Sequence, residues 1–388
     1  MRLLYVSHSF PLPDRPLSNV GGMQRVAVDL HRAFAADPEI ELHSLLLETT
    51  WRWTGVRTPP FLLSLLARIP RIVAAEGVQV VLFSSMVTAA VSPLVRNRIR
   101  RAGAIIAAIP VGRDVTLPNP AYQRFVPNVF DALDLVLPIS RATAEACIAR
   151  GAPPGKVHII PCGTDLGSAA GQQIDRDSAR TAVLDLLAER RVPLPPEPLL
   201  LLSVGRHQER KGFQWFVDEV MPGTPEHIVY VLVGSGPTTD RIRQTVERHG
   251  LERRVVLLGQ VSQPVLKTLY SGCDLFVMPN IPVPGDIEGF GVVMVEAGAA
   301  GLPVIAANLE GIRDVIAEGQ SGVLVGTRDV AAFTESILRY DDRRELAAAS
   351  SGARAYVREH FAWPAIAKRY IEIFREELRT STQPPAQA

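Results

Sequence analysis

Short runs of apolar residues recur along the chain and alternate with stretches in which apolar residues return every three or four positions. Such runs, often β-branched and without polar positions, are typical of strands buried on both faces of a parallel sheet. The strands predicted from this pattern are Leu3–Val6, Val78–Phe83, Ala104–Ile109, Leu135–Pro138, Val157–Ile160, Leu199–Val204, Ile228–Val233, Val255–Leu258, Leu275–Met278 and Pro303–Ala306. Their alternation with helical patterns predicts an α/β protein with doubly wound parallel sheets.

A proline-rich run interrupts this alternation. Residues 191–198 contain four prolines and cannot continue a helix, so we interpret them as a stiff linker. The chain has 388 residues, and domains usually hold about 100–200. We therefore expect an N-terminal domain at 1–190 and a C-terminal domain at 199–363. A last helical pattern begins at Trp363-Pro364, where proline suits the first turn, and carries an apolar stripe.

Composition narrows the functional classes. The chain has 41 basic and 40 acidic residues, so its net charge of +1 gives no general attraction to nucleic acid. The three cysteines form no metal-site spacing, which is typical of a reducing compartment. The apolar start Met1–Ser7 is too short for a signal peptide, and no stretch approaches the roughly 18 apolar residues that span a bilayer. We expect a cytoplasmic protein.

Two arginine-bearing stretches leave contact with the inner face of a membrane open. The first is 61–72 with Arg68 and Arg71, and the second carries Arg96, Arg98, Arg100 and Arg101. Both could meet anionic lipid. We favour the alternative interpretation, in which both are helix faces that cover a sheet.

The loop after the predicted strand Leu199–Val204 brings two cations together. Gly205-Arg206 opens the loop and Lys211-Gly212 closes it. In open parallel sheets, ligands bind beyond the carboxyl ends of the strands. Arginine can chelate a phosphate through two N–H groups, and lysine adds a compact charge. Arg206 and Lys211 are therefore candidates to hold a diphosphate. The alternative interpretation is a solvated charged turn.

Two glycine pairs also precede helical patterns. Gly21-Gly22 leads into a helix, and Gly234 and Gly236 follow the strand Ile228–Val233. Glycines at such places let backbone N–H groups approach an anion closely. Plain tight turns are the alternative.

The segment 286–297 is the richest in candidate chemistry. Gly289 and Gly291 open a helix, whose free N–H groups can face an anion. Glu288 lies at the helix entrance, and Glu296 lies about two turns further on a similar azimuth. Alternatively, Glu288 could be an acid at the helix start that the helix dipole stabilises, and Glu296 could be a surface residue. However, an acid among Val292, Val293 and Val295 is costly to bury without a partner, which favours a function.

Together these motifs resemble the retaining GT-B glycosyltransferases, specifically glycosyltransferase family 4 (glycosyl transferases group 1). The likeness covers nearly the whole chain. The matching segments are Gly21-Gly22-Met23-Gln24-Arg25, Gly205-Arg206 with Lys211-Gly212, Gly234-Ser235-Gly236, Glu288-Gly289-Phe290-Gly291 with Glu296, 301–306 and 311–316. The resemblance implies two Rossmann-like domains facing a cleft, with residues 364–388 packing back onto the N-terminal domain.

The resemblance also assigns roles. Arg206 and Lys211 would contact the donor diphosphate, and Glu288 the donor sugar near its anomeric carbon. Glu296 would bind the ribose, and the N–H groups of Phe290, Gly291 and Val292 would line the sugar and phosphate. Glycines 22, 205, 234 and 236 would complete the donor site, Gly22 from the opposite domain.

One departure concerns the N-terminal domain. Family members often carry His-Gly at the end of a strand there, whereas this chain has Val111-Gly112-Arg113-Asp114. Val111 stands where the histidine is expected, and Asp114 is a candidate to replace part of its role. Gly112, Arg113 and Asp114 are therefore placed on the acceptor or donor-sugar side.

The expected function is transfer of a sugar from a UDP- or GDP-sugar to a hydroxyl acceptor with retention of configuration, in glycan, polysaccharide or glycoconjugate biosynthesis. The acceptor could be lipid-linked. No cofactor and no catalytic metal are expected, because fixed cations would neutralise the leaving group. A sugar-nucleotide epimerase or hydrolase on the same fold is one alternative, and a non-catalytic donor-binding subunit is another.

Overall fold

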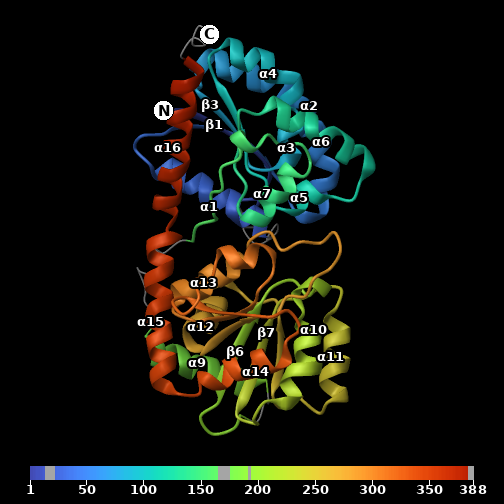
Figure 1. The fold of residues 1–388 in the computed structure, drawn as a ribbon, viewed down its shortest axis with the longest axis vertical. Helices are drawn as coiled ribbons and strands as arrows, with labels where there is room; N and C mark the ends of the chain where they lie inside the picture. The colour runs from blue at the N-terminus through green and yellow to red at the C-terminus, as the bar shows by residue number, and fades with distance from the viewer. Residues whose placement is uncertain (14–21, 165–174, 191–193, 383–388) are drawn as a thin grey trace. The chain divides into compact units, whose positions relative to one another are not determined.

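The computed structural model describes residues 1–13, 22–164, 175–190 and 194–382 (Figure 1). The chain divides into two compact units. Unit 1 consists of Met1–Gly163 and Trp363–Ala388, and unit 2 of Thr164–Ala362. The final helix therefore returns to the N-terminal domain, as expected.

The described residues of unit 1 form a five-stranded sheet in the order β2-β1-β3-β4-β5, in which every pair is parallel. The strands are β1 (Arg2–Phe10), β2 (Glu41–Glu48), β3 (Val80–Phe83), β4 (Ile105–Ala108) and β5 (Leu135–Val136). The direction of winding reverses between β1 and β3. Doubly wound sheets bind ligands at the carboxyl ends of the strands that flank such a switch point.

Helices cover both faces of the unit 1 sheet (Figure 1). On one face lie α2 (Trp51–Glu76), α4 (Ser92–Arg101) and α6 (Pro120–Ala132), whose apolar stripes share a buried core with the strands. On the other face α1 (Gly22–Ala36) packs against α16 (Trp363–Thr382), where the rings of Phe34 and Tyr370 meet edge to face at 5.8 Å. Shorter helices follow the strands, namely α3 (Met86–Ala89), α5 (Arg113–Thr116) and α7 (Arg141–Ile148).

The described residues of unit 2 form a six-stranded sheet in the order β11-β10-β9-β6-β7-β8, again parallel throughout. The strands are β6 (Leu199–Val204), β7 (Ile228–Val233), β8 (Val255–Gly259), β9 (Leu275–Met278), β10 (Val304–Ala307) and β11 (Gly322–Val325). This is the strand order of dinucleotide-binding folds, and its switch point lies between β6 and β9.

The helices of unit 2 also form two layers. On one side lie α9 (Arg176–Glu189), α12 (Gln263–Gly272), α13 (Val292–Ala300) and α15 (Arg343–His360). On the other side lie α10 (Phe213–Trp215), a π-helical turn η3 (Phe216–Val220), α11 (Thr239–Arg248) and α14 (Val330–Arg339). Figure 1 shows α9, α12 and α13 across the sheet from α10 and α11. Phe216, Tyr230 and Phe333 fill the core on the α10 side.

The boundary between the units differs from the one that the sequence predicts. Helix α9, which the prediction places in the first domain, belongs to unit 2. The buried carboxylate of Asp274 accepts from Arg176 at 3.1 Å and from Arg180 at 2.6 Å, and also pairs with Arg343. A Cβ on Gly272 of α12 would lie 2.5 Å from the carbonyl oxygen of Ala179, so the two helices pack closely. The predicted linker 191–198 therefore lies inside unit 2.

Nine of the ten predicted strands are present, with shifts at their ends. The prediction of a strand at Val157–Ile160 is wrong, because this segment makes one isolated bridge, to Val136. Strands β2 and β11 were missed. Both lie at the edge of a sheet, where half-exposed positions dilute the apolar signal. Among the described residues, no helix is long and apolar enough to span a bilayer.

Candidate functional site

The carboxyl ends of β6 and β9 bring the main predicted residues of unit 2 together. The loop after β6 carries Arg206 and Lys211, and the loop after β9 carries Glu288. Because the two strands are parallel neighbours, both loops leave the same edge of the sheet. The structure thus places Lys211 and Glu288 at the switch point.

Three glycines allow the loop after β6 to approach the loops after β9 and β7. A Cβ on Gly212, at φ 66°, would lie 1.8 Å from the carbonyl oxygen of Pro279 after β9. A Cβ on Gly234 would lie 2.0 Å from the carbonyl oxygen of Gly205, and one on Gly236 2.4 Å from that of His207. The predicted glycines therefore act by close backbone packing.

Lys211 and Glu288 form a buried ion pair. The Nζ of Lys211 lies 2.6 Å from Oε2 of Glu288, and both side chains are 9% exposed. Asn280 Nδ2 donates to the same Oε2 at 3.1 Å. Burial is the largest influence on the pKa of Glu288 and raises it, but Lys211, Arg210 and Asn280 together outweigh burial and keep the pKa below its usual range. Burial lowers the pKa of Lys211, and Glu288 opposes this effect.

Arg210 and Asn280 were not singled out from the sequence. Arg210 Nε lies 3.7 Å from Oε2 of Glu288 and 3.8 Å from Oδ1 of Asp286, and the Arg210 carbonyl accepts from Ile281 N–H. Asn280 is fully buried, and its Oδ1 has no hydrogen-bond partner among the described residues. A second cation and an amide thus surround the ion pair.

Arg206 differs from Lys211 in its exposure. Its side chain is exposed at the start of the same loop, whereas Lys211 is buried. Between them, His207 is fully buried, and its Nδ1 lies 2.9 Å from Thr239 Oγ1, which also accepts from Gly236 N–H. Burial lowers the pKa of His207 to about 4, so the ring is neutral and serves to join the two glycine loops.

Helix α13 begins at this site. Gly291 caps it at φ 81°, and the N–H groups of the first turn have no partners within the helix. Phe290 is buried, and its ring packs edge to face on Phe361 at 5.9 Å. Val292 is half-buried at the first helical position. Glu296 is half-buried, and its Oε2 accepts from the Tyr270 hydroxyl at 3.0 Å, so its acid has a partner.

Another carboxylate, Glu310, also contacts this site and was missed by sequence reasoning. Its Oε2 accepts a hydrogen bond from the backbone N–H of Glu288. Burial is the largest influence on its pKa and raises it. Glu310 follows β10 and lies directly before the segment 311–316 that resembles the family.

Residues 198–341 match the model of the glycosyl transferases group 1 family. This part of the chain is therefore similar to that family. The match covers the β6 loop, the Lys211–Glu288 pair and the α13 helix start, so the family's signature and the buried ion pair lie in the same unit.

Curated relatives agree with the family. A D-inositol 3-phosphate glycosyltransferase from Xylanimonas cellulosilytica is 31% identical over 260 residues, which are 65% of this chain and 59% of that protein. A GDP-mannose-dependent alpha-(1-6)-phosphatidylinositol monomannoside mannosyltransferase from Mycobacterium tuberculosis is 26% identical over 79% of this chain and 78% of its own. The match with the first relative thus spans less than two thirds of that protein.

A solved structure shares the fold. Anabaena Alr3699/HepE in complex with UDP and glucose superposes with a TM-score of 0.72 at 18% identity, covering 97% of this chain and all of that one. The GT-B fold expected from the resemblance is therefore confirmed.

The candidate residues of unit 1 lie after β4. Gly112, at φ 107°, precedes α5, and Arg113 is exposed. Asp114 is buried, and its two oxygens accept from Met86 N–H and Val111 N–H, each at 2.9 Å. Burial raises the pKa of Asp114 to about 6. The Asp114 carboxylate therefore joins the loops after β3 and β4.

Polar residues that were not predicted lie at the unit 1 switch point. His8 near the end of β1 is buried, with Nδ1 3.4 Å from Ser85 Oγ, and Ser84 donates to Ser7 at 2.8 Å. Burial lowers the pKa of His8 to about 4. Gly22 begins α1, and its neighbour Gly21 lies outside the described residues. A local sequence pattern could not show that His8 and Ser85 meet.

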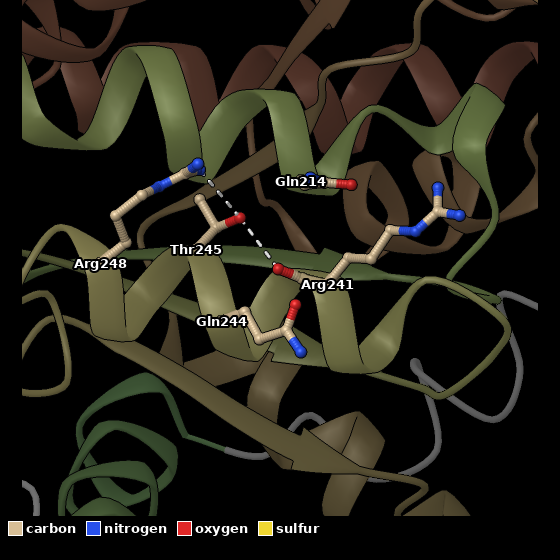
Figure 2. Close-up of a pocket in the computed structure, with 5 residues that line it drawn as sticks. All are labelled: Gln214, Arg241, Gln244, Thr245 and Arg248. Atoms are coloured by element: carbon tan, nitrogen blue, oxygen red, sulfur yellow. Dashed lines mark hydrogen bonds between the residues drawn. The ribbon is translucent and has the colours of Figure 1, made fainter.

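A small cavity of about 180 Å³ lies elsewhere in unit 2 (Figure 2). Gln214 of α10 and four residues of α11 line it, namely Arg241, Gln244, Thr245 and Arg248. Arg248 there pairs with Asp218 at 2.8 Å. None of the predicted site residues lines this cavity. No group of three or more His, Cys, Asp or Glu in the described parts of the chain could hold a metal ion.

Proposed function

We propose that this protein transfers a sugar from a nucleotide-diphosphate donor to a hydroxyl acceptor with retention of anomeric configuration. The observation that carries the proposal is the buried Lys211–Glu288 pair at the switch point of unit 2. A buried ammonium held beside a carboxylate, a second cation and a helix start offers both charge for a diphosphate and acceptors for sugar hydroxyls. GDP-mannose, named for the mannosyltransferase, is of this donor class, and UDP, named for the structural neighbour, is the nucleotide part of such a donor.

Each group then has a defined task. Arg206 and Lys211 contact the diphosphate, and the N–H groups of Phe290, Gly291 and Val292 line the sugar and phosphate. Glu288 accepts from donor-sugar hydroxyls, which its lowered pKa permits because the carboxylate is ionised at neutral pH. Glu296 binds the ribose.

The chemistry balances without a cofactor. The bond between the anomeric carbon and the diphosphate oxygen breaks, and its electron pair goes to that oxygen. The acceptor oxygen forms the new bond on the same face, and its proton moves to the leaving phosphate oxygen. Fixed cations and N–H groups stabilise the growing negative charge, a contribution typically worth roughly 2.7–4 kcal/mol per donor. Glu288 is a poor covalent nucleophile here, because Lys211 and Asn280 already occupy Oε2.

The acceptor is proposed to meet unit 1. Gly112, Arg113 and Asp114 lie beyond the carboxyl end of β4, beside the polar group formed by His8 and Ser85. The two backbone hydrogen bonds of Asp114 support a role in shaping this region rather than in proton transfer.

The experiment combines binding, turnover and product stereochemistry. A thermal-shift screen of UDP- and GDP-sugars identifies the donor, because a ligand that binds the native state raises its stability. Transfer to an acceptor panel is then followed by nucleoside diphosphate release and by NMR of the product anomer. Glu288→Gln should abolish transfer, whereas the exposed Glu335→Gln on α14 should not.

Two results would contradict the proposal and favour a different function. Rapid turnover of donor without acceptor would favour the epimerase or hydrolase, and tight donor binding without turnover on the whole panel would favour a donor-binding subunit.

A peripheral membrane contact is proposed for α2 and α4 of unit 1, which pack together. Between them these helices carry eight arginines and, within their bounds, one acid, Glu76. Four large apolar side chains on these helices are about half or more exposed, namely Trp53, Val56 and Leu63 of α2 and Leu94 of α4. Apolar side chains among arginines match an anionic lipid surface, where a lipid-linked acceptor would lie.

Vesicle co-sedimentation tests this contact. Vesicles with anionic lipid should bind the protein, and vesicles of neutral lipid should not. Binding should weaken in high salt and in Arg68→Glu with Arg71→Glu. Equal binding to both vesicle types, or none, would contradict the proposal.

A further inference from the structure

Glu310 has an unusual backbone. It begins a 3₁₀ turn, η5 (Glu310–Asp314), and has a φ of 47°. Side chains other than glycine seldom adopt this left-handed region, because Cβ crowds the backbone there. Such a conformation persists only where the surrounding structure requires it, and strained residues of this kind gather at functional sites.

The contacts of the 310–311 segment are with Glu288. Oε2 of Glu310 accepts from the backbone N–H of Glu288, and the N–H of Gly311 donates to the carbonyl of Glu288 at 3.2 Å. Both backbone polar groups of residue 288 are therefore tied to residues 310 and 311. One of these two ties depends on the Glu310 side chain.

Close packing reinforces this attachment. A Cβ on Gly311 would lie 2.1 Å from the carbonyl oxygen of Gly289 and 2.8 Å from that of Glu288. The two segments thus lie back to back with no room for a side chain at 311. Any change in the backbone at 310 would be transmitted to residue 288.

The Glu310 carboxylate also belongs to the charge group around Glu288. Arg210, Asp286 and Glu288 all act on it electrostatically, and it is half-buried. A carboxylate in such a place is costly unless it is hydrogen-bonded. The Glu288 N–H supplies this bond.

We propose that Glu310 is a positioning residue, whose carboxylate holds the backbone of Glu288 so that the Glu288 side chain meets the donor sugar in a fixed place. The proposal rests on the proposed function. Glu310 touches neither diphosphate nor nucleotide in this scheme. Its loss should therefore affect recognition of the sugar and leave recognition of the nucleoside diphosphate intact.

Two variants separate the side chain from the strained backbone. Glu310→Gly removes the carboxylate and suits φ 47°, whereas Glu310→Gln keeps the strain and an oxygen acceptor at the same reach. Arg328→Gly is the matched control. Arg328 is an exposed residue of the same unit with a φ of 58°, so this variant reports relief of a left-handed backbone alone.

The readouts are kcat, the affinity for UDP or GDP, and the affinity for the corresponding sugar nucleotide chosen by the thermal-shift screen. In Glu310→Gly we expect kcat to fall about 10- to 100-fold, as for loss of a charged hydrogen bond, with nucleoside diphosphate affinity within about twofold of wild type. Glu310→Gln should recover to within about threefold, and Arg328→Gly should match wild type in all three readouts.

Three results would overturn the proposal. Glu310→Gly could keep kcat within twofold, Glu310→Gln could fail to recover, or nucleoside diphosphate affinity could fall in parallel with kcat, as general loss of structure predicts. If wild type binds sugar nucleotides but transfers nothing, the ratio of the two affinities tests Glu310 by itself. If wild type binds neither ligand, the proposed function fails as well, and this is visible before any variant is made.

Discussion

The two sheets end in different chemistry at their switch points. In unit 2 the ends of β6 and β9 hold a buried ion pair, Lys211 with Glu288, and a second guanidinium. In unit 1 the ends of β1 and β3 hold neutral groups, His8 and Ser85, with the buried Asp114 bound to backbone N–H groups. The two switch points thus differ: unit 2 gathers cations suited to an anion, and unit 1 gathers uncharged side chains beside a hydrogen-bonded carboxylate.

The largest effect should come from removing the unit 2 cation. Lys211→Met leaves Glu288 buried without its ammonium, which typically costs about 3–5 kcal/mol of stability, and removes a transition-state contact. We expect turnover to fall by roughly 10²–10³-fold. Adding Glu288→Gln should restore much of the melting temperature without restoring activity. The exposed Lys267→Ala on α12 is the control, and a full rate in folded Lys211→Met would remove Lys211 from the reaction.

Gly212 offers a second way to break the charged site. Gly212→Ala places a Cβ 1.8 Å from the carbonyl of Pro279 and should cost several kcal/mol by forcing the β6 and β9 loops apart. Gly259→Ala has a similar φ, 71°, with nothing within 4 Å, and should cost only about 1–2 kcal/mol. Chemical denaturation compares the two. Equal losses would mean that the approach of the two loops is not tight.

The buried acid of unit 1 should be visible in the pH dependence of stability. The pKa of Asp114 rises from 3.8 to about 6 on folding, so its protonated form is favoured in the native state. The resulting stability is present below about pH 4 and is lost as the pH rises to 6, a change of roughly 3 kcal/mol. The melting temperature of Asp114→Asn relative to wild type should therefore increase from pH 4 to pH 6. A constant difference would contradict the raised pKa.

The smallest effect is expected at Tyr270. Tyr270→Phe removes the hydroxyl that donates to Glu296, a bond worth about 0.5–1.5 kcal/mol to a neutral partner and more to a charged one. Nucleotide affinity, measured calorimetrically, should fall by a few fold. Glu296→Ala should weaken it further, because it also removes the proposed ribose contact. If Tyr270→Phe proved the more damaging, the assigned role of Glu296 would be wrong.

The sequence predicts the residues at the unit 2 switch point better than those at the unit 1 switch point, and the reason is physical. Arg206, Lys211 and Glu288 follow long apolar runs, so the ends of the buried strands locate them. Glu310 and Asp114 act through bonds to residues 22 and 28 positions away, and no local period reports such contacts. Arg210 sat inside a recognised motif, yet only the structure shows it beside Glu288.

The fold follows the same rule. Central strands such as β6, β7 and β9 were predicted to the residue, because both of their faces are apolar. Edge strands β2 and β11 alternate or are short, and a proline on either side limits the ladder that was expected at Val157–Ile160. Residues 194–198 of the predicted linker are non-helical, as expected, and residues 191–193 lie outside the described residues; the segment does not mark the boundary between the units.

Arg176, Arg180 and Arg343 all pair with Asp274, and this limits where a chimera can join unit 1 of one relative to unit 2 of another. A chimera joined at residue 199 would separate Arg176 and Arg180 from the carboxylate of Asp274. It would also remove α9, which packs against α12. A chimera joined at 163/164 and 362/363 transplants all three guanidinium groups along with their acid. Donor specificity should therefore be swapped as the whole 164–362 segment.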